Sequence, residues 1–372
     1  MKIGFVRRGF SPSGGAESYL NRLARGITNA GHGVELFTTD EWPVEAWPFG
    51  PMRQLRATSP IAFADELTRL PTVADCDLLM SLERVWQCDV YRAGDGVHRA
   101  WLERRAKVSS PLRKLLGALN RKHTGILRLE EGLLVHRGAG RVLANSQMVK
   151  DEIVKFYGYP EDQIDLIYNG IPLEIFANAQ NRRRERREKL RLREDEIALL
   201  FVGSGWERKG LHHAIDAIAA CSNSKLRLFV AGRGNTARFK TERVDFFGEI
   251  NDVTVLYAAA DIFVLPTLYD PFSNACLEAL ACGLPVITTR DNGFSEVIED
   301  GIHGSIVDHA GDIDALRAAI LFWSDAVRRK DALPQILDRA AQFDISKNVD
   351  QTLRVLLQAP RAASASGKIR KT

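Results

Sequence analysis

Two carboxylates, Asp270 and Glu278, bracket seven residues and are the strongest chemical signal in the sequence. Pro271, Ser273 and Asn274 lie between them, and residues of these types favour the start of a helix. The backbone N–H groups of a first helical turn have no partner within the helix, so they bind anions well. The tract therefore predicts a site for a phosphorylated, hydroxyl-rich ligand.

An adjacent pair of cations, Arg208 and Lys209, follows an apolar run at 197–202 and lies in the glycine-rich segment 203–210. The apolar run predicts a strand, which places both cations in a turn before the next helix. Two neighbouring cations suit a diphosphate. An Arg-Lys pair alone is more often an ordinary solvated turn, but its place after a strand and a glycine loop favours ligand binding.

Two loops in the first half of the chain carry further candidate residues. Gly15 opens an expected helix, and glycine there lets the backbone approach a ligand closely. Asp95 is flanked by Gly94 and Gly96, with His98 nearby, which is typical of a tight loop that projects a carboxylate. An ordinary turn explains that segment equally well. Neither loop shows the glycine pattern of a dinucleotide site or a phosphate-binding lysine.

A basic stretch at residues 99–123 holds eight Lys and Arg against one acid. Apolar residues between 112 and 127 fall on one helical stripe, with cations on the other faces; these are Arg113, Lys114, Arg121 and Lys122. A basic amphipathic helix is typical of binding to an anionic membrane surface, although a helix packed on its own domain shows the same stripe. Nucleic-acid motifs and interleaved aromatics are missing, so nucleic acid is not an expected partner.

The length of 372 residues predicts about two domains. A strand–loop–helix–strand pattern occurs at 2–38 and again at 197–231, and such repeats form parallel sheets. We therefore expect an α/β protein with doubly wound domains at 1–170 and 171–344. A helix at about 345–358 could return to the first domain, and 359–372 is an expected disordered tail. One helix is expected at 312–327, and the charge-dense segment 181–196 predicts a solvated helix.

Composition argues against several classes of protein. No apolar run reaches 18 residues, and the N-terminus lacks the apolar core and cleavage site of a secretory signal, so we expect a cytoplasmic protein. Neither the eight His nor the five Cys show the spacing of a metal site, so no metal is expected.

Together these segments resemble the retaining glycosyltransferases of family 4, whose GT-B fold has two Rossmann-like domains facing a central cleft. Each segment is unspecific by itself, but their order along residues 1–355 is characteristic; they are 14–17, 142–146, 167–170, 202–210, 230–234, 247–248 and 269–278. Within the family, segments 91–98 and 269–278 look most like the bacterial lipopolysaccharide core α-1,3-glucosyltransferase (glucosyltransferase I) group.

The resemblance implies that the second domain binds a nucleotide-sugar donor and the first an acceptor. Arg208 and Lys209 match the pair that binds the donor diphosphate, and Glu278 matches the acid that holds the ribose. Asp270 matches the acid that contacts sugar hydroxyls; the family usually has Glu there, so the donor sugar stays open. The helix-start backbone near the phosphate and sugar is matched by Ser273, Asn274 and Ala275. Gly15 matches the first-domain loop near the diphosphate, and Asp95 or His98 matches the loop near the reacting sugar.

The implied reaction transfers a hexose, with retained anomeric configuration, from UDP-glucose to an inner-core heptose of lipopolysaccharide. Arg208 and Lys209 would stabilise the leaving diphosphate without a metal. The partners would be a lipid-anchored, phosphorylated acceptor and the anionic inner face of the cytoplasmic membrane, with the protein bound there peripherally. The alternatives are mannosyl or galactosyl transfer to another envelope glycan, a nucleotide-sugar 2-epimerase, and a sugar-binding protein without catalysis.

Overall fold

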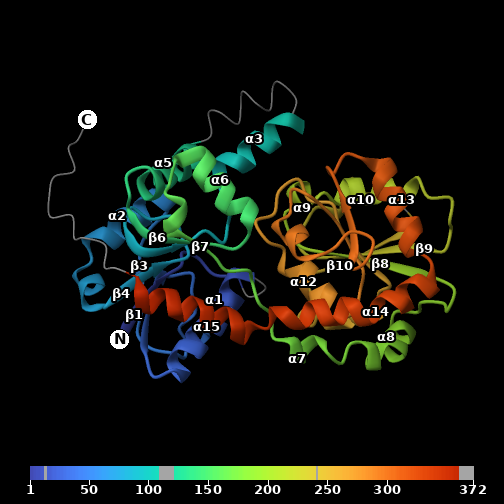
Figure 1. The fold of residues 1–372 in the computed structure, drawn as a ribbon, viewed down its shortest axis with the longest axis horizontal. Helices are drawn as coiled ribbons and strands as arrows, with labels where there is room; N and C mark the ends of the chain where they lie inside the picture. The colour runs from blue at the N-terminus through green and yellow to red at the C-terminus, as the bar shows by residue number, and fades with distance from the viewer. Residues whose placement is uncertain (12–14, 109–120, 240–241, 360–372) are drawn as a thin grey trace. The chain divides into compact units, whose positions relative to one another are not determined.

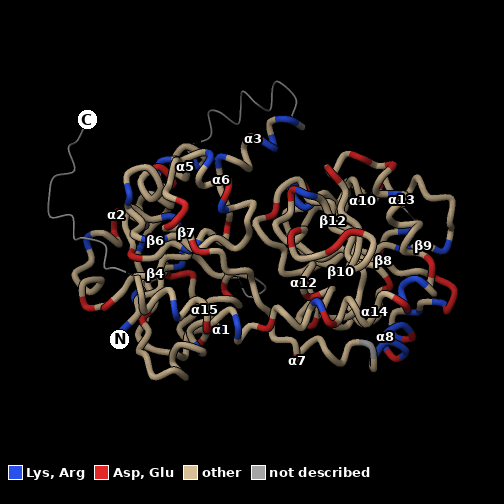
Figure 2. Tube along the Cα trace, viewed as in Figure 1, with Lys and Arg blue, Asp and Glu red and all other residues tan. Residues whose placement is uncertain are grey.

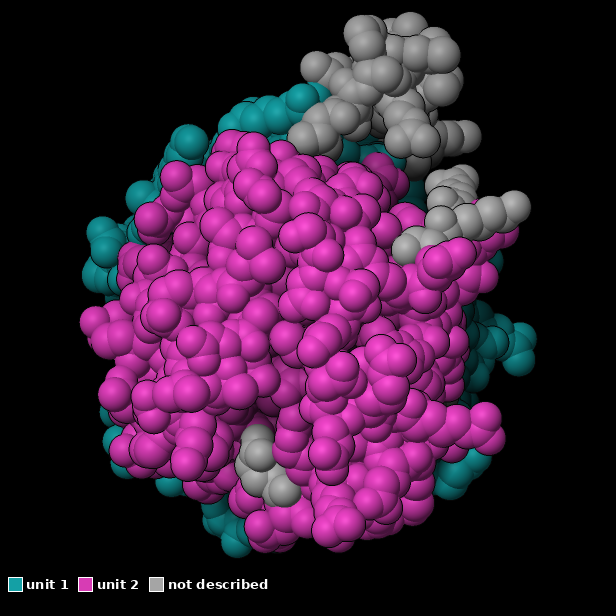
Figure 3. All heavy atoms as spheres, turned by 90° about the vertical axis from the view of Figure 1, so that its right-hand side faces the viewer, with its two compact units in different colours: residues 1–145, 149–167, 349–372 teal, residues 146–148, 168–348 magenta. Residues whose placement is uncertain are grey.

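The protein divides into two compact units in the computed structural model, which describes residues 1–11, 15–108, 121–239 and 242–359. Unit 1 holds residues 1–145, 149–167 and the chain from Val349 onward, and unit 2 holds 146–148 and 168–348. Figure 3 colours the two units separately. The chain therefore crosses between the units at four points. Residues 360–372 of the expected tail lie outside the described residues.

Unit 1 is built on a seven-stranded parallel sheet in the order β3-β2-β1-β4-β5-β6-β7 (Figure 1). The order reverses between β1 and β4, because the chain first builds outward to β3 and then continues on the other side of β1. The strands are β1 (Lys2–Val6), β2 (Gly33–Thr39), β3 (Met52–Leu55), β4 (Leu78–Ser81), β5 (Cys88–Arg92), β6 (Ala139–Ala144) and β7 (Ile164–Leu166).

The helices of unit 1 are α1 (Gly15–Asn29), α2 (Pro60–Arg69), α3 (His98–Val108), α5 (Arg121–Leu134) and α6 (Gln147–Tyr157), with 3-10 helices η1 (Val44–Ala46), η2 (Pro71–Asp75) and η3 (Glu161–Gln163). The C-terminal helix α15 (Ile345–Gln358) starts in unit 2 and continues in unit 1. A Cβ added to Gly26 of α1 would lie 2.3 Å from Val349 Cγ1, so α1 and α15 pack closely.

Unit 2 repeats this architecture with a six-stranded parallel sheet in the order β10-β9-β8-β11-β12-β13. Its strands are β8 (Ile197–Val202), β9 (Leu226–Ala231), β10 (Val244–Gly248), β11 (Ile262–Leu265), β12 (Val286–Thr289) and β13 (Gly304–Val307). The strand order reverses between β8 and β11. Strands β11 and β12 are buried throughout, as expected where helices cover both faces of a parallel sheet. The two sheets confirm the predicted α/β class.

The helices of unit 2 are α7 (Leu173–Phe176), α8 (Arg183–Lys189), α9 (Trp206–Lys209), α10 (Leu211–Ala219), α11 (Thr254–Ala259), α12 (Asn274–Ala281), α13 (Ile313–Trp323) and α14 (Ala326–Ala340), with 3-10 helices η4 (Gln180–Arg182), η5 (Thr236–Arg238), η6 (Gly293–Val297) and η7 (Ala341–Phe343). The single helix expected at 312–327 is wrong. Helix α13 ends at Trp323, and the Asp325 carboxylate accepts from Val327 N at 2.8 Å, which starts α14. Within the described ranges, no helix is long and apolar enough to cross a membrane.

The charge-dense segment around α8 is solvated on one face only. Arg184 is 94% exposed, as predicted, but Arg183 and Arg187 reach the buried carboxylate of Asp261 at 2.6 and 3.0 Å. Arg329 of α14 contacts the same carboxylate at 3.2 Å. Figure 2 shows the Lys and Arg of α8 in blue. The expectation of a solvated helix therefore holds for one face of α8 only, because Arg183 and Arg187 neutralise a buried acid.

Candidate active site

The predicted donor residues of unit 2 lie where its strand order reverses. The loop at 203–210 follows β8, and the segment at 266–273 follows β11, its neighbour in the sheet. Open parallel sheets bind ligands outside the carboxyl ends of their strands at such a reversal. The topology of unit 2 therefore brings together two segments that are about sixty residues apart in the sequence.

The loop after β8 depends on glycine for its close contact with the segment after β11. Gly210 has φ 76°, and a Cβ there would lie 1.8 Å from the carbonyl oxygen of Pro266. The Arg208 carbonyl accepts hydrogen bonds from Leu268 N and Thr267 Oγ1, both at 2.9 Å. These bonds join the two segments, so the short helix α9 holds its two cations against the chain that carries Asp270.

Arg208, Lys209 and Asp270 form one charged cluster. Lys209 Nζ lies 2.6 Å from Asp270 Oδ2, and Arg208 Nη1 lies 3.7 Å from the same oxygen and donates to the Tyr269 carbonyl at 2.7 Å. Burial by itself raises the pKa of Asp270, but the charges of Lys209 and Arg208 outweigh burial and hold that pKa below 3.8. Two cations and one carboxylate leave a net positive charge beside the start of α12.

Ser273 is the N-cap of α12 and its polar groups are used within the protein. Its Oγ accepts from Cys276 N at 3.4 Å, and its own N–H donates to Asn292 Oδ1 at 3.2 Å. The next two N–H groups, of Asn274 and Ala275, belong to the first turn, where no helical carbonyl can pair with them. The N–H groups that are suited to bind an anion therefore begin one residue later than the serine.

Glu278 lies one turn beyond Asn274, so both side chains are on the same face of α12. Tyr257 donates its hydroxyl to Glu278 Oε2 at 3.0 Å and contacts the Ala275 carbonyl at 3.1 Å. Burial and the charge of Glu278 raise the pKa of Tyr257, so the phenol stays a donor that orients the carboxylate. Asp270 and Glu278 thus lie before and after the first turn of α12.

Asn292 is a site residue that the sequence reasoning missed. It is fully buried; its Oδ1 also accepts from Phe294 N at 3.1 Å, and its Nδ2 donates to Thr288 Oγ1 at 2.9 Å. The adjacent backbone pairs with Asp270, whose carbonyl accepts from Gly293 N at 2.9 Å. Asn292 therefore fixes both Asp270 and the start of α12. The Asn-Gly dipeptide at 292–293 signals a turn, but a turn signal does not reveal which groups the amide binds.

In unit 1, Asp95 lies on the loop between β5 and α3 beside Arg7, a second residue that the sequence reasoning missed. Arg7 Nη1 lies 3.4 Å from Asp95 Oδ2 and 3.1 Å from Glu83 Oε1, and Arg7 Nη2 lies 3.2 Å from Glu17 Oε1. Burial raises the pKa of Asp95, but the charges of Arg7 and Arg84 together lower it more, so the net shift of the pKa is downward. The Asp95 side chain is 48% exposed. Arg7 directly follows β1, which is the signal that could have identified it.

His98 forms a hydrogen bond with a second imidazole. Its Nε2 lies 2.9 Å from Nδ1 of His123, a residue of α5. Burial, followed by the positive charge of Arg84, lowers the pKa of His98 from 6.5 to about 4. His98 is therefore neutral near pH 7 and can exchange hydrogen bonds without carrying charge.

The remaining predicted residues are only partly described. Gly15 is the first residue of α1 and is exposed, next to the undescribed residues 12–14. Of the expected membrane patch, Arg113 and Lys114 lie outside the described residues; Arg121 begins α5, and Lys122 is exposed. The structure thus brings Arg208, Lys209 and Asp270 into direct contact in unit 2. In unit 1 it places Asp95 on the loop after β5 and His98 at the first position of α3.

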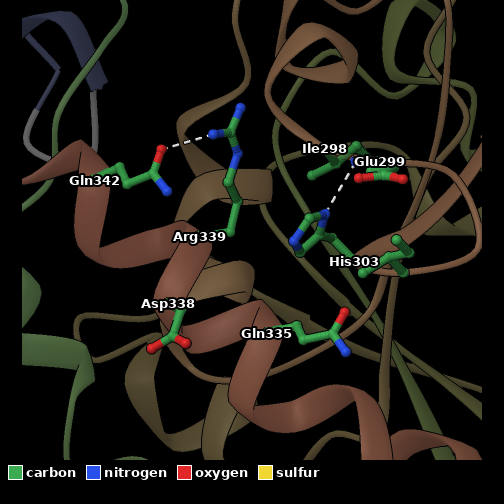
Figure 4. Close-up of a pocket in the computed structure, with 8 residues that line it drawn as sticks. Ile298, Glu299, His303, Gln335, Asp338, Arg339 and Gln342 are labelled. Carbon is green, nitrogen blue, oxygen red and sulfur yellow. Dashed lines mark hydrogen bonds between the residues drawn. The ribbon is translucent and has the colours of Figure 1, made fainter.

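A separate surface pocket of about 440 Å³ lies elsewhere in unit 2, between residues 298–303 and the end of α14 (Figure 4). Two of its polar groups are already satisfied: His303 Nδ1 accepts from Glu299 N at 3.0 Å, and Arg339 Nη1 donates to Gln342 at 2.6 Å. None of the sequence-predicted residues lines it. The pocket is therefore not the candidate active site.

Comparison with protein families agrees with this architecture. The model for Glycosyltransferase Family 4 matches residues 13–175, and the model for Glycosyl transferases group 1 matches residues 182–333. The chain is therefore a glycosyltransferase with the GT-B fold, in which a family 4 domain precedes a group 1 domain. The predicted family and fold are confirmed.

The chain is also similar in sequence to individual proteins of this kind. The chain is 31% identical to an uncharacterised glycosyltransferase of Methanocaldococcus jannaschii over 44% of this chain, and that match spans less than half (46%) of the relative. It is 29% identical to a probable transglycosylase of Burkholderia thailandensis over 96% of this chain and 98% of that protein. It is 24% identical to the lipopolysaccharide glucosyltransferase WaaG of Escherichia coli over 82% and 85% of the two chains.

Two solved structures share the fold. A crystal structure of WaaG, described as a glycosyltransferase of lipopolysaccharide biosynthesis, matches with a TM-score of 0.83 at 21% identity and covers 95% of this chain and 99% of that one. The structure of Anabaena HepE in complex with UDP-glucose matches with a TM-score of 0.74 at 19% identity, over 96% and 100% of the chains.

Proposed function

We propose that the protein transfers glucose from UDP-glucose to an inner-core heptose of lipopolysaccharide, with retention of configuration. Binding of the nucleotide-sugar donor is supported above all by one observation, the Arg208–Lys209–Asp270 cluster. This cluster lies beside the first turn of α12, at the strand-order reversal of unit 2. The relationship to the lipopolysaccharide glucosyltransferase WaaG supports glucose as the sugar and lipopolysaccharide as the acceptor class, and the UDP-glucose bound to HepE supports the donor class.

In the proposed donor site, different residues of unit 2 bind different parts of the nucleotide sugar. Arg208, Lys209 and the first-turn N–H groups of α12 bind the diphosphate, Glu278 binds the ribose, and Asp270 binds sugar hydroxyls. The bond between the anomeric carbon and the diphosphate oxygen breaks, and its electron pair stays on the diphosphate. The acceptor oxygen bonds to the same face of the anomeric carbon and passes its proton to the leaving phosphate. The cations stabilise the growing charge, so no metal is required.

Acceptor-dependent release of UDP tests this function. Thermal stabilisation by a panel of UDP- and GDP-sugars identifies the donor, and purified core acceptors are then added to the best one. We expect UDP-glucose to stabilise the protein and UDP to form only with a heptose-bearing core acceptor. Stabilisation by a UDP-galactose or GDP-mannose donor instead, or isomerisation of the donor without an acceptor, would replace the proposal with one of its alternatives.

We further propose that the protein acts peripherally on the inner face of the cytoplasmic membrane through its basic stretch, to reach a lipid-anchored, phosphorylated acceptor. The charge pattern at Arg113, Lys114, Arg121 and Lys122 supports this. Replacing all four by Gln should release the protein from vesicles that contain anionic lipid while soluble-acceptor turnover stays. Equal vesicle binding by the variant would assign these residues to an ordinary surface helix.

A further inference from the structure

A buried carboxylate on α5, Glu130, collects hydrogen bonds from three separate parts of unit 1. Only 1% of Glu130 is exposed. Its Oε1 accepts from Arg84 Nε at 2.8 Å and from His98 N at 2.6 Å, and its Oε2 accepts from Arg99 N at 3.3 Å and from Tyr157 Oη at 2.6 Å. Glu130 thus connects the segment after β4, the start of α3 and the end of α6.

Arg84 extends this network to the loop that carries Asp95. Its Nη2 donates to the Gly96 carbonyl at 2.7 Å while its Nε donates to Glu130. The guanidinium side chain is only 11% exposed, and its planar fork makes both bonds at once. The loop is therefore held at its Gly96 carbonyl by the cation and at its His98 amide by the carboxylate.

This arrangement differs from ordinary helix capping. A capping side chain normally belongs to the residue just before the helix, but the residue before α3 is the apolar Val97. The cap comes instead from Glu130, 32 residues later in the sequence. The end of the Asp95–His98 segment is therefore held by a distant buried ion pair, while Asn145 Nδ2 donates to the Gly94 carbonyl at 3.3 Å at its beginning.

We propose that Glu130, acting through Arg84 and the start of α3, is the positioning residue for Asp95 and His98. It touches no substrate itself. The inference rests on the proposed function and on the family resemblance, which implies that Asp95 or His98 lies near the reacting sugar. A shift of about 1 Å in a reacting geometry can lower a rate about 10²-fold, so the pair should act on turnover rather than on donor affinity.

Glu130→Gln tests this role because it keeps the shape and replaces one acceptor oxygen with a donor. We expect kcat for transfer to fall about 10²-fold, while thermal stabilisation by UDP stays as in the unaltered protein, because the diphosphate residues belong to unit 2. Arg84→Lys is the second variant, since an ammonium does not reproduce the fork that reaches both Glu130 and Gly96; it should lower kcat in the same way.

Tyr157→Phe is the matched control. It removes one hydrogen bond from Glu130 but leaves the bonds to the loop, so kcat should stay within about twofold of the original value. The double variant Glu130→Gln with Asp95→Asn should lose less activity than the two single losses combined, because the effects of residues that act as one unit are not additive. A general loss of structure would instead slow the double variant further and weaken UDP binding.

The outcomes separate this inference from the proposed function. If Asp95→Asn abolishes transfer while both Glu130→Gln and Arg84→Lys keep full kcat, the positioning role is wrong and the proposed function stands. If Asp95→Asn, His98→Asn and Lys209→Ala all keep full transfer, the proposed roles of the two half-sites are wrong. If the losses of Glu130→Gln and Asp95→Asn simply add, the pair is structural and the inference is overturned.

Discussion

At the residue scale, the charge state of each candidate side chain follows from its neighbours rather than from its type. Asp270 is 5% exposed and Lys209 lies 2.6 Å away, so its carboxylate stays ionised in a buried place. His98 is partly buried near the cation of Arg84, and this holds its imidazole neutral. Asp270 therefore provides a fixed negative charge, whereas His98 provides a neutral hydrogen-bonding group.

Lys209→Ala should lower kcat about 10²–10³-fold, because it removes a cation expected to stabilise charge on the leaving diphosphate. Steady-state UDP release with donor and acceptor measures the effect. Lys225→Ala is the matched control, since that ammonium is half-exposed and pairs with Asp195 at the amino end of β9. Turnover near the original level in Lys209→Ala would exclude this role.

The lowered pKa of His98 predicts a pH dependence of stability. The unfolded chain takes up a proton at His98 below about pH 6.5, whereas the folded chain does so only near pH 4. The contribution of the neutral imidazole is therefore complete above pH 6.5 and is lost progressively as the pH falls towards 4. His98→Asn should flatten the free energy of unfolding over this window, measured by urea denaturation at half-unit steps. Parallel curves for both proteins would contradict the shift.

At the scale of elements, the sequence predicted well those helices and strands whose ends carry capping or turn residues. Helix α12 begins at Asn274, within the segment where the sequence predicts a helix start, because Ser273 caps it, and it ends at Ala281, shortly before Gly283. Strand β3 was missed since it is short and mostly exposed, with only Leu55 buried. Strand β13 was missed because it starts at Gly304, where a Cβ would lie 1.9 Å from the Val286 carbonyl. Close packing, not a strand pattern, selects that glycine.

Asp261→Asn should lower the free energy of unfolding by about 3–5 kcal/mol, because it leaves the partly buried cations of Arg183, Arg187 and Arg329 without their common anion. Chemical denaturation measures the change. Arg184→Ala is the control: this exposed side chain pairs with the exposed Glu188 across one turn, so its removal should change stability little. A loss below 1 kcal/mol in Asp261→Asn would show that the basic segment does not need this anchor.

At the scale of the whole molecule, two sheets of similar topology divide the predicted tasks. All donor candidates except Gly15 lie in unit 2 near the β8–β11 reversal, whereas Gly15, Asp95 and His98 belong to unit 1. The chain crosses between the units four times, so neither unit is a simple continuous half of the sequence.

Removal of divalent metal should leave turnover unchanged, since we propose that Arg208 and Lys209 supply the positive charge that a metal would otherwise provide. UDP release is measured after dialysis against EDTA, with and without added Mg²⁺ or Mn²⁺. Within the described residues, no cluster of three or more His, Cys, Asp or Glu is arranged to hold a metal ion. Loss of turnover in EDTA that Mg²⁺ restores would show that the cations alone are insufficient.

Strand–loop–helix periodicity and local spacing are visible along the chain, so the sequence alone predicted the parallel-sheet fold, the family, and the cation pair and carboxylates of the proposed donor site. Only the tertiary structure revealed that Lys209 pairs with Asp270, that Asn292 fixes the start of α12, and that Glu130 caps α3. These contacts join residues 19 to 61 positions apart. The crossover connections of the sheets bring these residues together, and no local sequence pattern indicates which distant residues will meet.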